Sequence, residues 1–94
     1  MNYPLIRFEL AEEIERELAK ARTKFPDSIC SMTALTEEVG ELAKALLDES
    51  ADRVRQEAVQ VAVMAIRVAT EGDASIDAYR ARRGLPALAR AGEG

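Results

Sequence analysis

The sequence contains no histidine and no tryptophan, and Cys30 is its single cysteine. One cysteine excludes a disulfide within the chain and fits a reducing compartment, so we expect a cytoplasmic protein. Without histidine the chain lacks the commonest general base and the commonest zinc ligand. Any metal chemistry must therefore use oxygen ligands, which favour a hard cation, Mg²⁺ or alternatively Mn²⁺. A lone cysteine without histidine is also a poor nucleophile, and we interpret Cys30 as a packing or surface residue.

Aromatic residues are scarce, at 4% of the 94 residues, although 48% of the residues are hydrophobic. The hydrophobic residues are mostly alanine, valine and leucine, which favours closely packed helices over a bulky sandwich core. No apolar run approaches the roughly 20 residues of a membrane span, and the N-terminus shows no secretion signal. The formal net charge of −4 argues against nonspecific binding to nucleic acid, which needs a basic surface. We expect neither a membrane nor a nucleic acid as a partner.

Apolar residues that recur at steps of three and four predict three long helices, and a short helix is expected near the C-terminus. The predicted fold class is all-α, an antiparallel helical bundle formed by a single domain over residues 1–94. Residues 1–4 are interpreted as a loose lead-in and residues 87–94 as a frayed tail. The first helix is expected to start at residue 5 or 8 and to end at 24, and the second to run from a cap at 27, 28 or 31 to 47. The third is expected over residues 51–70. The short fourth helix is expected to start at 73 or 75 and to end at 83.

Residues with strong preferences for helix ends mark these boundaries. Asp27, Ser28 or Ser31 is the expected N-cap of the second helix, and Ser50 is the expected N-cap of the third. Gly72 suits the left-handed position that ends the third helix. Because only a short connection separates the second and third helices, these two helices should run antiparallel.

Each long helix is expected to bury an apolar face. The expected faces of the first two helices are Phe8, Ala11, Ile14, Leu18, Ala21 and Phe25, and Met32, Leu35, Val39, Leu42 and Leu46. The third helix is apolar on two sides, with Val54, Ala58, Val61, Ala65 and Val68 on one and Val59, Val63 and Ile66 on the other. A helix that is apolar on two sides must be buried on two sides, and one small chain has few helices to cover both. We therefore expect a homo-oligomer, either a homodimer or a homotetramer.

Oxygen-bearing side chains lie at matching distances on either side of the turn near Glu49. Glu41 and Glu57 are each eight residues from this turn, and Glu38 and Gln60 are each eleven. In an antiparallel hairpin such pairs stand at the same height, roughly 12 to 16 Å from the turn. Converging carboxylates repel one another unless a cation lies between them. The pattern therefore predicts a metal site, although acidic residues on an amphipathic helix can also form a solvated charged face.

The run Glu37-Glu38-Val39-Gly40-Glu41, with Glu57-Ala58-Val59-Gln60 on the next helix, resembles a known motif. The MazG-like all-α nucleoside triphosphate pyrophosphohydrolases carry Glu-Glu-X-X-Glu followed by Glu-X-X-Asp. Dimeric dUTPases and phosphoribosyl-ATP pyrophosphohydrolases are relatives. The resemblance implies an Mg²⁺-dependent enzyme that converts an NTP or dNTP to the monophosphate and pyrophosphate, and that cleans the nucleotide pool.

The resemblance also implies roles for individual residues. Glu38, Glu41 and Glu57 would be metal ligands, with Gln60 in the fourth position. Glu37 would orient or deprotonate the attacking water or assist a second ion, so Glu37 and Glu38 are the expected catalytic residues. The chemistry is consistent with an acidic protein, which can bind a triphosphate only through bridging cations.

Basic and aromatic residues supply the candidate contacts to the substrate. Arginines beside Tyr79 could reach phosphates while the tyrosine stacks on a base, and Lys20 or Lys24 of the first helix could touch a phosphate. A solvated charged surface is the alternative for all of them. The expected substrate-binding residues are Lys44, Arg67, Tyr79, Arg80 and Arg83.

Gln60 departs from the family's pattern, which has an aspartate at that position. Glutamine offers a carbonyl oxygen but no charge, so metal binding should be weaker or should depend more on substrate phosphates and water. An alternative function is therefore a non-catalytic MazG-like module that binds a nucleotide or a partner protein. A helical oligomer with an accidental cluster of acids is a third.

Overall fold

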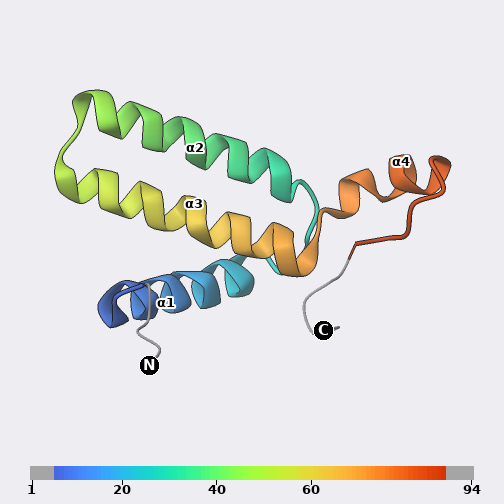
Figure 1. Cartoon of the computed structure of the whole chain (residues 1–94), viewed down its shortest axis with the longest axis horizontal. Helices are drawn as coiled ribbons and strands as arrows, with labels where there is room; N and C mark the ends of the chain where they lie inside the picture. The colour runs from blue at the N-terminus through green and yellow to red at the C-terminus, as the bar shows by residue number, and fades with distance from the viewer. Residues whose placement is uncertain (1–5, 89–94) are drawn as a thin grey trace.

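The computed structural model describes residues 6–88. The predicted lead-in and most of the predicted tail therefore lie outside the described residues. Within residues 6–88 the chain is helical and contains no strand. The elements, in chain order, are α1 (Phe8–Lys24), α2 (Ser31–Asp48), α3 (Ala51–Glu71), the 3₁₀ turn η1 (Ala74–Ile76) and α4 (Asp77–Arg82), as Figure 1 shows. The prediction of an all-α chain with three long helices and a short fourth is confirmed.

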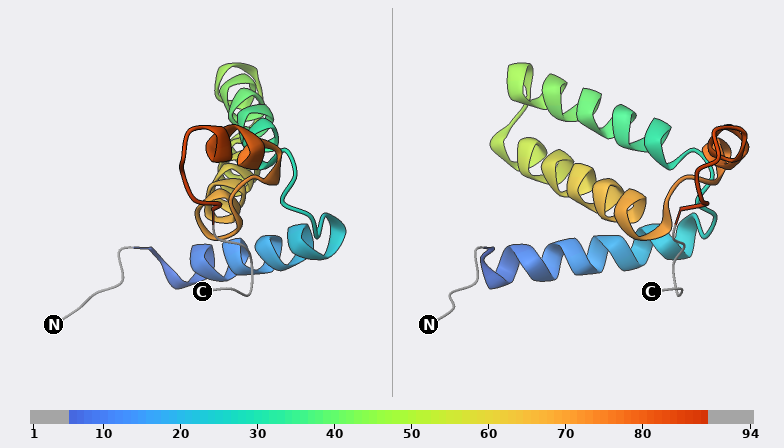
Figure 2. Two further views of the ribbon diagram at one scale, coloured as in Figure 1. Left: turned by 90° about the vertical axis from the view of Figure 1, so that its right-hand side faces the viewer. Right: turned by 45° about the vertical axis from the view of Figure 1, so that its right-hand side comes forward.

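The three long helices are stacked with α3 in the middle. Glu49 and Ser50 join α2 to α3, and the two helices run side by side in opposite directions as a hairpin (Figure 1). α1 crosses the hairpin at an angle on the side of α3 away from α2 (Figure 2). α4 projects beyond the end of the hairpin at which α3 ends (Figure 1). No helix within residues 6–88 has the length and apolar character needed to cross a bilayer.

A small apolar core lies between α1 and α3. Leu18 of α1 packs with Val59 and Val63 of α3, and all three are buried. Four partly buried residues surround them: Leu10, Ile14, Ala21 and Ile66. Val59 and Val63 belong to one of the two apolar sides predicted for this helix, and α1 is the element that covers that side.

The predicted burial of the α2 stripe is wrong for three of its five members, whereas Leu35 and Leu42 are partly buried. Three of its members are about half or more exposed: Met32 (53%), Val39 (48%) and Leu46 (66%). The residues of α2 that lie closest to α3 are instead Ser31, Glu38 and Ala45, a row at steps of seven, and Ala45 is 1% exposed. At about 100° per residue, a buried face centred on this row leaves Met32, Val39 and Leu46 on the outer flank of α2.

Other apolar residues predicted to be buried are also exposed. Phe8 and Phe25, at the two ends of the α1 stripe, are 70% and 60% exposed, because α1 crosses α3 at an angle and its ends diverge from it (Figure 2). Ala58 and Ala65 of α3 are exposed as well. Helical geometry places them on the same face of the hairpin as the exposed α2 stripe, opposite α1. We call this face, formed by Met32, Val39, Leu46, Ala58 and Ala65, the apolar flank.

The start of α2 is capped from a distant part of the chain. Cys30 occupies the N-cap in a left-handed conformation and contributes no side-chain cap, so the prediction of Asp27, Ser28 or Ser31 is wrong. Asp73, which is 3% exposed, accepts hydrogen bonds from the N–H groups of Cys30 (3.0 Å) and Met32 (2.9 Å). These bonds fix the loop after α3 to the first turn of α2. At the other boundaries, Ser50 caps α3 and Gly72 has a positive φ of 71°, as predicted.

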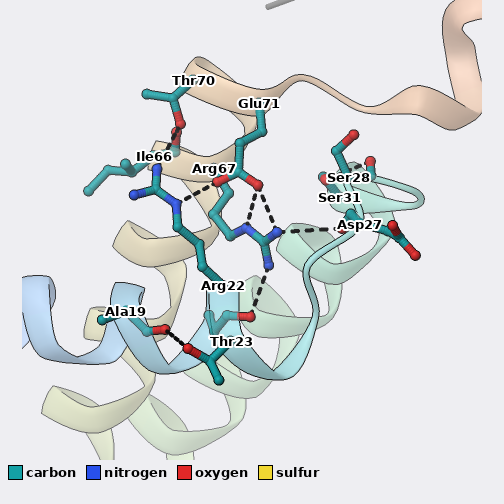
Figure 3. Close-up of polar contacts among 11 residues, drawn as sticks. Ala19, Arg22, Thr23, Asp27, Ser28, Ser31, Ile66, Arg67, Thr70 and Glu71 are labelled. Atoms are coloured by element: carbon teal, nitrogen blue, oxygen red, sulfur yellow. Dashed lines mark hydrogen bonds and ion pairs between the residues drawn. The ribbon is translucent and has the colours of Figure 1, made fainter. Parts of the chain in front are cut away.

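A buried ion-pair network joins the ends of α1 and α3 (Figure 3). The Arg67 guanidinium donates to Glu71 Oε1 from Nε (3.0 Å) and Nη2 (2.7 Å), and both side chains are 3% exposed. Arg22 of α1 donates from Nε to the other oxygen of Glu71 at 2.8 Å. Burial opposes ionisation of Glu71, but the two arginines outweigh it and hold its pKa below the ordinary value. This network stabilises the crossing of α1 over α3.

Replacing Asp73 with asparagine tests the long-range cap. Burial opposes its ionisation, but hydrogen bonds from Ser75, Met32 and Cys30 outweigh it and lower the pKa of Asp73. A lowered folded-state pKa gives stability that is present above the unfolded pKa and is lost as pH falls through the folded value. We expect the variant to lose about 1–2 kcal/mol at pH 7 and the difference to shrink below pH 4, measured by urea unfolding.

Asp48→Asn, at an exposed position at the end of α2, is the control and should unfold like the original chain at both pH values. Equal stability of Asp73→Asn and the original chain at pH 7 would contradict the capping role.

Candidate functional site

Two of the predicted metal ligands meet across the interface between α2 and α3. Glu57 of α3 is 8% exposed, Glu38 of α2 is half-buried, and their carboxyl groups are close enough for Glu57 to raise the pKa of Glu38. Burial raises the pKa of Glu38, as do the hydrogen bond with Glu57 and the negative charges of Glu57, Glu41 and Glu37. A raised pKa means that Glu38 holds a proton more readily than a glutamate in water does.

The contact differs from the pairing that counting from the turn predicts. Counting places Glu41 level with Glu57, but Glu41 is exposed, although its charge acts on Arg53 of α3. Glu38 belongs to the row of α2 that faces α3, so it is the residue that reaches Glu57. A difference of three residues is about 4.5 Å along a helix, which two glutamate side chains span. Glu41 remains close enough for its charge to act on Glu38.

Arg53 also contacts Glu57, one turn earlier on the same helix. Its Nη2 atom donates to Glu57 Oε1 at 2.6 Å. The remaining donors of the guanidinium bind Glu49 (from Nε, 3.2 Å) and Gln56 (from Nη1, 2.9 Å). Arg53 is not among the site residues predicted from the sequence, although an arginine four residues before a glutamate is a pattern that predicts an ion pair on a helix.

Gln60 is oriented by α1. Its Nε2 atom donates to Glu17 Oε1 at 2.9 Å, and Glu17 in turn pairs with Lys20 at 3.0 Å. Because the amide nitrogen of Gln60 is used in this way, its carbonyl oxygen is the atom available to a ligand.

Two cavities adjoin the carboxylates, one on each side of Gln60, which lines both. The first, which we call the apolar cavity, has a volume of about 420 Å³. Its apolar wall comes from all three long helices and the loop before α2. That wall consists of Ala21, Phe25, Ile29, Ala34 and Met64. The polar residues around it include Ser31, Thr33, Glu37, Glu38, Gln60 and Arg67.

The second, which we call the polar cavity, has a volume of about 460 Å³ and lies between α1 and α3. Three cations and three carboxylates line it: Arg16, Lys20, Arg53, Glu13, Glu17 and Glu57. Both volumes are in the range of small-molecule sites. Lys20, a candidate phosphate contact in the sequence, is therefore near the carboxylates, whereas Lys24 lines neither cavity.

Most of the predicted substrate-binding residues lie away from the carboxylates. Lys44 pairs with Glu49 at 3.8 Å and lines neither cavity. Tyr79 lies on α4 with the Arg83 guanidinium 5.7 Å from its ring centre, and Arg80 donates to the Pro86 carbonyl at 2.9 Å. These three residues also line neither cavity.

Arg67 is the exception, because it lines the apolar cavity. Its guanidinium is bound to Glu71 and also donates to the carbonyl oxygens of Ala21 (3.3 Å) and Asp27 (3.4 Å). Arg67 therefore supports the wall of the cavity and the end of α1.

The donor set fits a cation that completes its coordination with other ligands. No group of three or more His, Cys, Asp or Glu side chains within residues 6–88 is arranged to hold a metal. Glu38 and Glu57 do meet, however, and both supply oxygen atoms. Mg²⁺ usually binds proteins through one or two carboxylates and keeps water or substrate phosphates as its other ligands. The residues present therefore fit Mg²⁺ in combination with a phosphate-bearing substrate.

Comparisons of the chain with family models, with curated proteins and with solved structures give no match. The functional assignment consequently depends on the residues and on the geometry described above.

Replacing Glu38 with glutamine should stabilise the metal-free protein. An acid whose folded-state pKa is raised costs stability above its unfolded pKa, and the cost is complete above the folded pKa. Removing one of two facing carboxylates eliminates that cost, so we expect a gain of about 1 kcal/mol at pH 7.5, measured by urea unfolding without divalent ions.

Glu37→Gln is the matched control, because Glu37 is exposed on the same helix, and it should change stability little. A Glu38→Gln variant that is no more stable than Glu37→Gln would show that the two carboxyls do not oppose each other.

Proposed function

We propose that the protein is an Mg²⁺-dependent nucleoside triphosphate pyrophosphohydrolase of the MazG-like all-α type. It converts an NTP or dNTP to the monophosphate and pyrophosphate in cleaning the cytoplasmic nucleotide pool. The observation that carries this proposal is the contact between Glu38 and Glu57. These residues come from the two halves of the motif and adjoin cavities of suitable size.

The nucleoside occupies the apolar cavity in this proposal. Phe25 and Met64 offer apolar surface to a base, while Ser31 and Thr33 offer hydroxyl groups to its polar edge. The triphosphate then lies toward Glu38, Glu57 and Gln60, which border the same cavity or the one beside it.

The carboxylates hold Mg²⁺ and prepare the attacking water. Glu38 and Glu57 are the ligands that already meet, and Glu41 and the carbonyl oxygen of Gln60 are the remaining candidates. The ion supplies charge neutralisation at the phosphoryl group and at the pyrophosphate leaving group. Glu37 lies at the edge of the apolar cavity, where its carboxylate can accept a proton from water.

One observation favours the alternative of a non-catalytic nucleotide-binding or partner-binding module. Gln60 brings no negative charge, and its amide is bound to Glu17 of α1. A site with fewer charges binds Mg²⁺ more weakly. The protein would then bind a nucleotide without turning it over.

A second copy of the chain covers the apolar flank in the proposed assembly. Met32, Val39 and Leu46 are exposed at steps of seven, and Ala58 and Ala65 of α3 continue this uncharged face. A two-fold dimer that packs one hairpin against the other would bury the exposed apolar residues of α2 and of α3. It would leave the cavities open, because they lie on the other face of the hairpin. A homodimer is the simplest state, and a homotetramer would be a pair of such dimers.

Hydrolysis of a panel of NTPs and dNTPs tests the activity. We expect Mg²⁺-dependent release of pyrophosphate and a loss of at least about a hundredfold in kcat/KM for Glu57→Gln, because a buried metal ligand is removed. Glu15→Gln, an exposed change on α1, is the control and should retain full activity. Pyrophosphate release that is the same for Glu57→Gln and Glu15→Gln would exclude this mechanism.

The double variant Gln60→Asp with Glu17→Gln separates a weak enzyme from a binding module. The change at Gln60 restores the fourth carboxylate of the family's motif. The change at Glu17, the partner of Gln60 on α1, replaces a carboxylate with a neutral amide that can donate a hydrogen bond. Nucleotide binding without turnover in the original chain, with turnover gained in the double variant, would favour the binding module.

The apolar flank can be tested by Leu46→Glu. A charge within the proposed interface should dissociate the dimer, so sedimentation velocity at micromolar protein should show monomers. Leu85→Glu, at an exposed position after α4, is the control and should leave the dimer intact. An original chain that sediments as a monomer would contradict the assembly.

A further inference from the structure

Arg53 forms an ion pair with Glu57, a carboxylate that the proposed metal would need as a ligand. Its Nη2 atom lies 2.6 Å from Glu57 Oε1, and the Glu57 side chain is 10% exposed whereas that of Arg53 is 47% exposed. The carboxylate is therefore buried and held in position by a cation that reaches it from the surface.

The guanidinium performs the electrostatic role that a divalent cation would have at this point. It places positive charge against a carboxylate that also faces Glu38, and so reduces the repulsion between the two acids. A guanidinium and a divalent ion on the same carboxylate would repel each other strongly at such short range. Binding of the ion at Glu57 therefore requires Arg53 to move.

The polar cavity provides an alternative position for the Arg53 side chain. Arg53 lines the polar cavity together with Arg16 and Lys20, on the side of Glu57 that faces α1. Guanidinium groups bind phosphate oxygens well, often through two parallel hydrogen bonds. A polyphosphate that enters this cavity would give Arg53 a new partner when it leaves Glu57.

We infer that Arg53 is a positioning residue that holds Glu57 until substrate arrives and that opposes the binding of free divalent cations. The metal then enters together with the polyphosphate, whose oxygens bind Arg53 in place of Glu57. This inference rests on the proposed function and adds an order of binding to it.

Binding of Mn²⁺ without nucleotide, followed by electron paramagnetic resonance, tests the inference directly. We expect Arg53→Gln to bind Mn²⁺ about fivefold more tightly than the original chain, a change of the size that a partly exposed ion pair supports. Arg53→Lys retains the charge and should remain close to the original affinity. Far-UV circular dichroism checks that each variant is folded.

Arg55→Gln is the matched control. Arg55 lies two residues further along α3, is 53% exposed at its side chain and pairs with Glu13 of α1 at 2.9 Å. Its loss changes the net charge by the same amount but leaves Glu57 untouched, so its Mn²⁺ affinity should equal that of the original chain. In the hydrolysis assay, Arg53→Gln should raise KM for the Mg²⁺–nucleotide complex, whereas Arg55→Gln should not.

Each outcome separates the inference from the proposed function. Equal Mn²⁺ affinities for Arg53→Gln and Arg55→Gln would overturn the role of Arg53. The pyrophosphohydrolase proposal would stand in that case if the original chain hydrolyses nucleotides. Mn²⁺ binding that appears only in Arg53→Gln would support the inference in its strongest form. No binding in any variant would overturn the inference, and if nucleotides also remain intact it would overturn both.

Discussion

Two carboxyl groups, Glu38 and Glu57, meet across the interface between α2 and α3, and the remaining parts of the structure hold them there. Like charges at a helix interface cost free energy, and burial adds to that cost. Here the contact is held within a hairpin whose facing row on α2 is small at Ser31 and Ala45. Arg53 balances the charge of Glu57. A locally unfavourable contact inside a well-connected scaffold is typical of functional sites.

The scaffold fixes the hairpin at both ends. At the turn, Ser50 caps α3 and the Arg53 side chain bonds Glu49, so the connection is tied to the first turn of the helix. At the open end, Asp73 holds the first turn of α2. The Arg67–Glu71 pair and Arg22 hold α1 at the same end. Because the apolar core is small, these polar connections determine how the three helices lie around the carboxylates.

Much of the fold could be predicted from the sequence, because helix length and helix ends depend on local chemistry. The three long helices, the cap at Ser50 and the positive φ of Gly72 all follow from short stretches of residues. The choice of Glu38 and Glu57 as ligands depended on the motif and on the short turn. What failed was the rotation of α2. Three of the five residues of the apolar stripe are exposed, since the buried face of α2 is centred on the row of Ser31, Glu38 and Ala45.

Interactions between distant segments were the other part that the sequence could not predict. Asp73 caps a helix that begins more than forty residues earlier, and nothing in the local pattern pairs it with Cys30 or Met32. Arg67 looked like a substrate contact because its binding partners, Glu71 and two carbonyl groups near the end of α1, are brought together only by the fold. Ion pairs one helical turn apart, such as Arg53 and Glu57, could in principle have been predicted from the sequence.

The departure at Gln60 has a structural explanation in the neighbouring helix. An aspartate here would stand opposite Glu17 and near Glu57, adding a fourth negative charge to the wall of the polar cavity. Glutamine instead donates to Glu17 at 2.9 Å and retains a carbonyl oxygen. The residue that differs from the family's pattern is thus matched to this chain's own α1. In the proposed function, a cation at this site would take more of its coordination from substrate phosphates, because the amide brings no charge.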